Sequence, residues 1–209
     1  MSLKTFVSEA LTDFSTVAAV TPSSKYLAHA MLEHLPLAGT RVAVEFGAGT
    51  GAITHELLAQ LPRNATLFVF EINRRFYDCL RRNISDSRVA LIHTSAENLD
   101  IELRRRGVQR VDAVVSSLGL AFMPGRERHA LFQKLLPFLH ERSVFTQYHY
   151  IHGLQFVEGR LRQMHMAPLL RRYFDSVESK IVWRNLPPAH VFTCRMHRTP
   201  RHLGSSLIT

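Results

Sequence analysis

The residues that point most directly to chemistry form an acidic, glycine-rich loop. Residues 42–51, V-A-V-E-F-G-A-G-T-G, join an apolar run to a segment with helical spacing. Glycines permit a tight turn and let a ligand approach the backbone closely. Glu45 stands just before the loop, where a carboxylate would oppose a pyrophosphate but would suit a cationic amino acid group. A second acid, Glu71, ends the next apolar run, and a carboxylate there can bind both hydroxyls of a ribose.

Predicted strands and helices alternate around this loop. The strands are expected at 41–46, 66–71, 89–93, 111–116 and 143–148, and the helices at 24–35, 53–60, 74–83, 98–106 and 126–139. This alternation predicts an α/β fold with a Rossmann-like, doubly wound, mostly parallel seven-stranded sheet. Two later apolar runs, 181–183 and 191–194, predict an antiparallel hairpin at the sheet edge.

The length is that of one domain, predicted over residues 1–209. Apolar side chains at helical spacing in 3–18 predict an N-terminal amphipathic helix and lid within 1–24. That helix could dock on its own domain or insert into a surface. Residues 25–150 are the expected cofactor-binding core, and 151–209 a basic part that faces substrate or membrane and includes the edge hairpin.

Charge is distributed unevenly along the chain, whose formal net charge is +9. Residues 101–209 hold 17 basic and 7 acidic side chains, so this part favours an acidic partner. At 46 % hydrophobic and 21 % charged, the composition is globular rather than disordered. Two cysteines without a CxxC pair predict neither a disulfide framework nor a metal site. No run approaches the roughly 18 apolar residues of a spanning helix, so only peripheral membrane contact is expected.

The run VEFGAGTGAIT followed by LFVFEIN resembles the cofactor half of class I methyltransferases, which use S-adenosyl-L-methionine. The resemblance implies Glu45 and the glycine loop around the methionine part, Glu71 on the ribose and Ile72 beside the adenine. In 93–99, Ser95 stands where the family has an acid that reads adenine, and Glu97 is the candidate to replace that acid. The implied cofactor-binding residues are Pro22, Ser23, Ser24, Glu45, Phe46, Gly47, Ala48, Gly49, Gly51, Glu71, Ile72, Asn73, Ser95, Ala96, Glu97, Ser116 and Ser117.

Four further segments resemble bacterial phospholipid N-methyltransferases in family order. They are TPSS at 21–24, VVSSLGLAFMP at 114–124, FTQYHY at 145–150 and NLPPA at 185–189. The resemblance implies in-line methyl transfer to the head-group amine of a membrane aminophospholipid, from phosphatidylethanolamine toward phosphatidylcholine. Ser117 replaces a glycine and Gly119 a proline of the family pattern, so another aminolipid stays open.

An amine substrate must lose a proton before it can attack, because a primary ammonium has a pKa near ~10. His149 is the candidate acceptor, with His152 second. Tyr148 and Tyr150 are candidates to orient the amine and to stabilise the growing charge by cation–π attraction. Tyr150 is expected just past the end of its strand, where sites of this fold open. The predicted substrate-binding residues are Tyr26, Leu118, Phe122 and His152.

Two other functions remain open. An rRNA or DNA adenine N-methyltransferase would share the fold and the basic half, but residues 116–124 lack the proline–aromatic pair that holds a flipped base. A non-catalytic cofactor-binding module is the second alternative. In segment 154–172 arginines alternate with apolar residues, which suits an anionic membrane surface, although a solvated face over a core stripe fits equally. We therefore expect a cytoplasmic protein at the inner face of the membrane and favour nucleic acid less.

Overall fold

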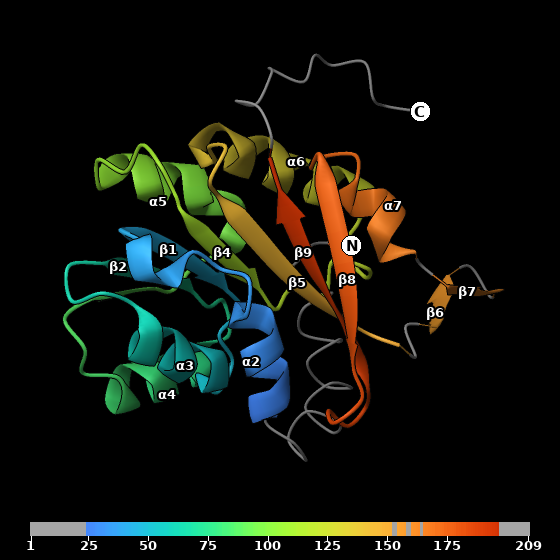
Figure 1. Ribbon diagram of the computed structural model, residues 1–209, viewed down its shortest axis with the longest axis horizontal. Helices are drawn as coiled ribbons and strands as arrows, with labels where there is room; N and C mark the ends of the chain where they lie inside the picture. The colour runs from blue at the N-terminus through green and yellow to red at the C-terminus, as the bar shows by residue number, and fades with distance from the viewer. Residues whose placement is uncertain (1–23, 152–153, 158–159, 164, 197–209) are drawn as a thin grey trace.

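The structure is a computed structural model that describes residues 24–151, 154–157, 160–163 and 165–196 (Figure 1). Within them, a seven-stranded sheet has the order β3-β2-β1-β4-β5-β9-β8, and β6 and β7 form a separate two-stranded sheet. The first five strands are parallel, and β9 is antiparallel to both β5 and β8. The strands are β1 Val42–Phe46, β2 Thr66–Phe70, β3 Val89–Ile92, β4 Ala113–Ser116, β5 Val144–Tyr150, β6 Leu154–Val157, β7 Arg160–Gln163, β8 Ser176–Val182 and β9 Ala189–Arg195.

Helices cover both faces of the large sheet. Helices α2, α3 and α4 contribute to one hydrophobic core and α5, α6 and α7 to the other, and Figure 1 shows the two groups on opposite sides. Their bounds are α2 Lys25–Leu32, α3 Ala52–Gln60, α4 Arg74–Asn83, α5 Leu99–Arg105, α6 Gly125–Leu135 and α7 Met166–Leu170. This arrangement confirms the predicted doubly wound sheet with an antiparallel pair at one edge.

Each face of the sheet contributes side chains to one of these two cores, because successive side chains of a strand point to opposite faces. In β1, Val44 and Phe46 lie in the core under α5 and α6, whereas Ala43 lies in the core under α2 and α3. The same alternation assigns the remaining strand residues to a face.

Several predicted boundaries are corrected by tertiary pairing. Strand β5 runs on to Tyr150, two residues beyond the prediction, because β9 pairs with it as far as Ala189. Strand β8 begins at Ser176 rather than 181, since its polar residues lie on the exposed sheet edge. Within the basic segment 154–172, for which no strand was predicted, Leu154–Val157 and Arg160–Gln163 form the β6–β7 pair.

The predicted N-terminal helix and lid, with Pro22 and Ser23, lie outside the described residues, as does His152. Among the helices of the described part, none is long and apolar enough to cross a membrane. The same part contains no cluster of three or more His, Cys, Asp or Glu side chains that could hold a metal ion.

Candidate functional site

The glycine loop turns the chain sharply from β1 into α3. Gly47, Gly49 and Gly51 have φ angles of +72°, +55° and +89°, a region that other residues rarely adopt. A Cβ on Gly51 would lie 2.8 Å from Leu80 Cδ2, so α4 leaves no room for a side chain. A Cβ on Gly49 would meet nothing within 4 Å, so the backbone there is open to a ligand.

Glu71 braces this loop from the end of β2. Its carboxylate accepts hydrogen bonds from the backbone N–H of Gly49 at 2.9 Å and of Asn73 at 2.8 Å. Burial raises the pKa of Glu71, and these N–H donors oppose the rise. Asn73 also accepts from the N–H groups of Arg75 and Phe76 as the N-cap of α4. The structure therefore brings three predicted cofactor residues, Gly49, Glu71 and Asn73, together at the ends of the adjacent strands β1 and β2. Asn73 also caps α4.

Glu45 is fully buried, and neither oxygen of its carboxyl group has a hydrogen-bond partner. Strand alternation points it at the α2–α3 face, opposite the core that holds Phe46. Burial raises its pKa to about 8, the nearby Thr54 hydroxyl, itself without a hydrogen-bond partner, opposes the rise, and the charge of Glu71 adds to it. A buried acid without a partner is costly, and a cationic ligand would offset that cost.

The end of β4 meets the loop from its other side. Ser117 N donates to Phe46 O at 2.9 Å, and a Cβ on Gly47 would touch Leu118 at 3.5 Å. Ser116 is fully buried. The Phe46 ring packs edge-on against Phe70 in the core, so only the backbone of this predicted cofactor residue faces the loop.

The segment for which the resemblance implies adenine contacts follows β3. Ser95 Oγ accepts from Glu97 N at 3.3 Å and caps a short 3-10 turn that includes the buried Ala96. His93 Nε2 lies 3.2 Å from Ile72 O, which brings this segment to the end of β2. Burial raises the pKa of Glu97, with help from the charge of Glu127. This segment thus lies next to Ile72, and contact of Ser95 and Glu97 with adenine stays a prediction.

These residues fit S-adenosylmethionine on structural grounds. The orphaned Glu45 carboxyl group can hold a cationic amino group, and Glu71 retains acceptor capacity for ribose hydroxyls. The open backbone at Gly49 lies between these two acids.

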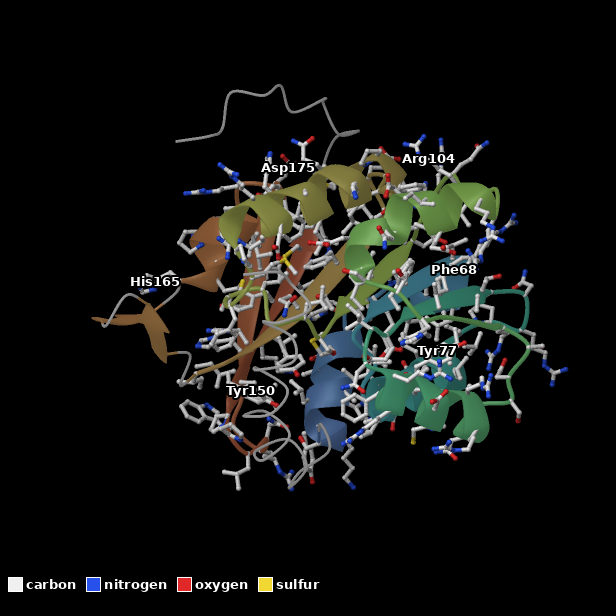
Figure 2. All side chains as sticks on the ribbon, turned by 180° about the vertical axis from the view of Figure 1, so that it is seen from behind. Phe68, Tyr77, Arg104, Tyr150, His165 and Asp175 are labelled. Carbon is white, nitrogen blue, oxygen red and sulfur yellow. The ribbon has the colours of Figure 1, made fainter. Side chains whose placement is uncertain are left out.

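A second cluster joins three segments that are far apart in the sequence. Asn185 Oδ1 accepts from Ser24 Oγ at 2.8 Å and from Ser24 N at 3.2 Å, so the start of α2 is tied to the turn after β8. Burial raises the pKa of Tyr150, and hydrogen bonds to the side chains of Tyr148 and Asn185 oppose the rise. The two tyrosine rings meet edge-on with centroids 5.3 Å apart. Figure 2 shows Tyr150 at the end of the molecule away from Arg104 and Asp175.

His149 is separated from the tyrosines by strand alternation. Tyr148 and Tyr150 pack on the α2–α3 core, the side that Glu45 faces, whereas His149 points to the other face. There it lies opposite His190 in the β5–β9 register. Burial, together with the charge of His190, lowers the pKa of His149. The structure thus brings the two tyrosines together and leaves the predicted proton acceptor on the far side of the sheet.

The other predicted substrate residues lie apart from one another. Tyr26 packs on the α2–α3 core beneath the guanidinium of Arg184, 4.1 Å from its ring centre. Leu118 and Phe122 are half-buried against the opposite core.

Sequence reasoning named no role for Asn185 or Gln147, although both lie in the motifs that carry the family resemblance. Gln147 is fully buried, and its Nε2 donates to Leu118 O at 2.9 Å and Tyr148 O at 2.6 Å. It fixes the segment after β4 to β5, on the face of the sheet that His149 occupies. A glutamine inside a predicted strand of a parallel sheet, where both faces are expected to be buried, was the available signal.

The sheet order and the loop define the fold of a class I methyltransferase, and comparisons with known proteins agree. Residues 43–142 match the family model described as "Methyltransferase domain". The chain is 29 % identical over 182 residues to an ornithine lipid N-methyltransferase of Singulisphaera acidiphila, covering 87 % of this chain and 89 % of that protein.

Two solved structures share the fold. One is the 1,6-didemethyltoxoflavin-N1-methyltransferase of Burkholderia thailandensis with bound S-adenosylhomocysteine, at a TM-score of 0.64 and 18 % identity over 94 % of this chain and 91 % of that one. The other is the magnesium protoporphyrin IX methyltransferase of Synechocystis PCC 6803 with bound S-adenosylmethionine. Its TM-score is 0.58 and its sequence identity 11 %, over 82 % of this chain and 77 % of that one. The chain therefore carries a methyltransferase domain and has the class I methyltransferase fold, and the residues around its glycine loop fit S-adenosyl-L-methionine.

Proposed function

We propose that this methyltransferase transfers a methyl group to the amine of a membrane aminolipid. The 29 % identity with an ornithine lipid N-methyltransferase, which extends over 87 % of the chain, supports a lipid amine as acceptor. Phosphatidylethanolamine and ornithine lipid are the two head groups that we propose to compare. Action at an anionic membrane surface on the cytoplasmic side belongs to the same proposal.

The convergence of Ser24, Tyr150 and Asn185 is the observation that carries this proposal. These residues come from the three motifs 21–24, 145–150 and 185–189 that resemble phospholipid N-methyltransferases. Ser24 bonds to Asn185, and Tyr150 pairs with Ala189 in the β5–β9 register, close enough for Asn185 to oppose the rise of its pKa. Core packing alone would not require three distant motifs to share one polar cluster. Their meeting at the end of β5 is what a common substrate would require.

The cluster can serve an amine in two ways. Because burial raises the pKa of Tyr150, its phenol stays protonated at neutral pH and can orient an amine by hydrogen bonding without adding charge. The faces of the two tyrosine rings can stabilise the positive charge that develops on the nitrogen. Asn185 holds the Tyr150 hydroxyl, and its bond to Ser24 fixes the start of α2 in the same place. The bound cofactor supplies an activated methyl group on a sulfonium.

One labelling assay tests the proposal. Purified protein and radiolabelled S-adenosylmethionine would be incubated with phosphatidylethanolamine or ornithine lipid in detergent micelles, and in parallel with total RNA. We expect label in at least one aminolipid and none in RNA. Label in RNA alone, or in neither lipid, would refute a lipid amine as the acceptor.

The role of the tyrosine hydroxyl has its own variant, Tyr150→Phe. It keeps the ring but removes the hydrogen bond to Asn185, so we expect kcat to fall about tenfold, the equivalent of one such bond. The dissociation constant of S-adenosylhomocysteine should not change. Tyr173→Phe is the matched control, because Tyr173 stacks on Phe132 in the other core and bonds to His129. Equal rates for both variants would contradict the role assigned to Tyr150.

A further inference from the structure

The turn between β8 and β9, residues 183–188, exposes large apolar side chains to solvent. Trp183 is 70 % exposed and Leu186 is 77 % exposed. Among the described residues, the third exposed large apolar side chain is Ile101 of α5, at 58 %. Two of these three side chains therefore lie within four residues of each other, on a turn that projects from the lower end of the sheet in Figure 1.

Cationic side chains surround these two apolar residues. Arg184 is exposed and lies over the Tyr26 ring at 4.1 Å, and Lys25 approaches the same ring at 5.7 Å. Lys180 is exposed as well, and its charge is shared with Glu33 at 2.7 Å. Tryptophan prefers the interface between lipid and water, and arginine and lysine there attract anionic head groups. This combination of side chains is chemically complementary to an anionic bilayer surface.

The shape of the region also favours lipid over protein. A stable protein interface uses roughly 20–30 residues on each side. The turn comprises only the six residues 183–188, which is too few for such an interface. Beside it, a hollow of about 590 Å³ runs between α2 and β8 and is lined by Ala30, Ile181 and Val182 together with the cations Lys180 and Arg184. Such a hollow offers apolar walls and counter-charges to a lipid at its mouth.

The turn is physically continuous with the candidate substrate site. Asn185, buried inside the turn, bonds to Ser24, and the end of the turn pairs with Tyr150 and Ile151 through Ala189 and Pro188. A membrane that meets Trp183 and Leu186 would therefore lie next to the tyrosine cluster, where a lipid amine has to arrive.

We propose that the β8–β9 turn is the membrane-contacting surface of this enzyme, with Trp183 and Leu186 inserted among the lipids and Arg184 facing their phosphates. The inference rests on the proposed function, because it names the surface that delivers the lipid to that site. It assigns membrane contact to a part of the chain other than the N-terminal helix and segment 154–172.

The sequence provides its own probe, because Trp183 is its only tryptophan. The full chain would be titrated with phosphatidylcholine vesicles, with and without phosphatidylglycerol, while tryptophan emission is recorded. We expect a shift to shorter wavelength that is larger with phosphatidylglycerol, and quenching by phosphatidylcholine with brominated acyl chains. Emission that stays unchanged while the protein floats with the vesicles would overturn the proposal, as would a failure to bind vesicles.

Variants measure how much the turn contributes to vesicle binding. Trp183→Ala combined with Leu186→Ala should weaken partitioning by at least about tenfold, since two large apolar side chains no longer leave water. Arg184→Gln should weaken it about fivefold on vesicles that contain phosphatidylglycerol, the effect of one basic residue. Ile101→Ala is the matched control and should partition like the unaltered protein. Wild-type partitioning by the double variant would refute the assignment.

The two proposals fail in distinguishable ways. Methylation of detergent-dispersed lipid requires no bilayer, so its absence in the unaltered protein counts against the lipid substrate. An unresponsive Trp183 together with normal methylation in detergent counts against the turn alone.

Discussion

Replacing Glu45 by glutamine should stabilise the cofactor-free protein while weakening its hold on the cofactor. Glu45 is fully buried, and its carboxyl oxygens have no hydrogen-bond partner. Its pKa rises from 4.5 to about 8 in the fold. In the unfolded chain the group ionises near its ordinary pKa, whereas in the folded chain it must stay protonated. Folding stability is therefore lost as the pH rises between these two values.

The magnitude follows from the pKa difference. At about 1.36 kcal/mol per pH unit, the difference between pH 7 and the unfolded-state pKa of 4.5 corresponds to a loss of about 3 kcal/mol in the free energy of unfolding. Urea unfolding of the empty protein should show this loss between pH 4.5 and 7, and Glu45→Gln should remove it. Glu178→Gln is the control, because Glu178 is an exposed acid on the edge strand that faces Arg195. Unchanged pH dependence in the Glu45 variant would refute the argument.

The same variant reports on ligand binding. If an ionised Glu45 holds the amino group, binding of S-adenosylhomocysteine must release the proton that Glu45 carries at neutral pH. Calorimetry in buffers of different ionisation enthalpy should show that release in the unaltered protein. With glutamine at this position the release should vanish and the affinity should fall at least about tenfold, as expected for a lost charge-assisted hydrogen bond.

Two further predictions concern the scaffold of the site. Gly51→Ala should lower the free energy of unfolding by about 1–3 kcal/mol, because φ is +89° and the new Cβ would press on Leu80. Gly39→Ala is the control, since a Cβ at Gly39 meets nothing within 4 Å. Equal melting temperatures for the two variants would contradict this prediction. Asp112→Ala should lower the free energy of unfolding by about 1–2 kcal/mol, since this change removes the oxygen that accepts hydrogen bonds from the N–H groups of Arg41 and Val42. Chemical denaturation would show no change if those bonds contribute nothing.

Local patterns predicted most of the parallel half of the sheet. The glycine loop and the run before it depend on neighbours in the sequence, so residues 42–51 could be interpreted without knowing the rest of the chain. The polar edge strand β8 was predicted too short, because Ser176, Glu178 and Lys180 lack the apolar alternation of a half-buried strand.

Long-range contacts were beyond that reasoning. The bond between Ser24 and Asn185 spans 161 residues, and no periodicity indicates it. Strand alternation, by contrast, was available, and it would have placed His149 on the face opposite Tyr148 and Tyr150. The side chain of Ser24, which the resemblance assigns to the cofactor, both caps α2 and bonds to Asn185.

The insertion of β9 between β5 and β8 has a consequence for the synthesis of this protein. While the ribosome is still making residues 151–188, β5 has β4 on one side and an open hydrogen-bonding edge on the other. Open edges next to aromatic side chains such as Phe145 invite pairing with other chains. The growing chain therefore carries an open sheet edge until residues 189–195 have been made, and the cluster of Ser24, Asn185 and Tyr150 forms only after Asn185 has been added.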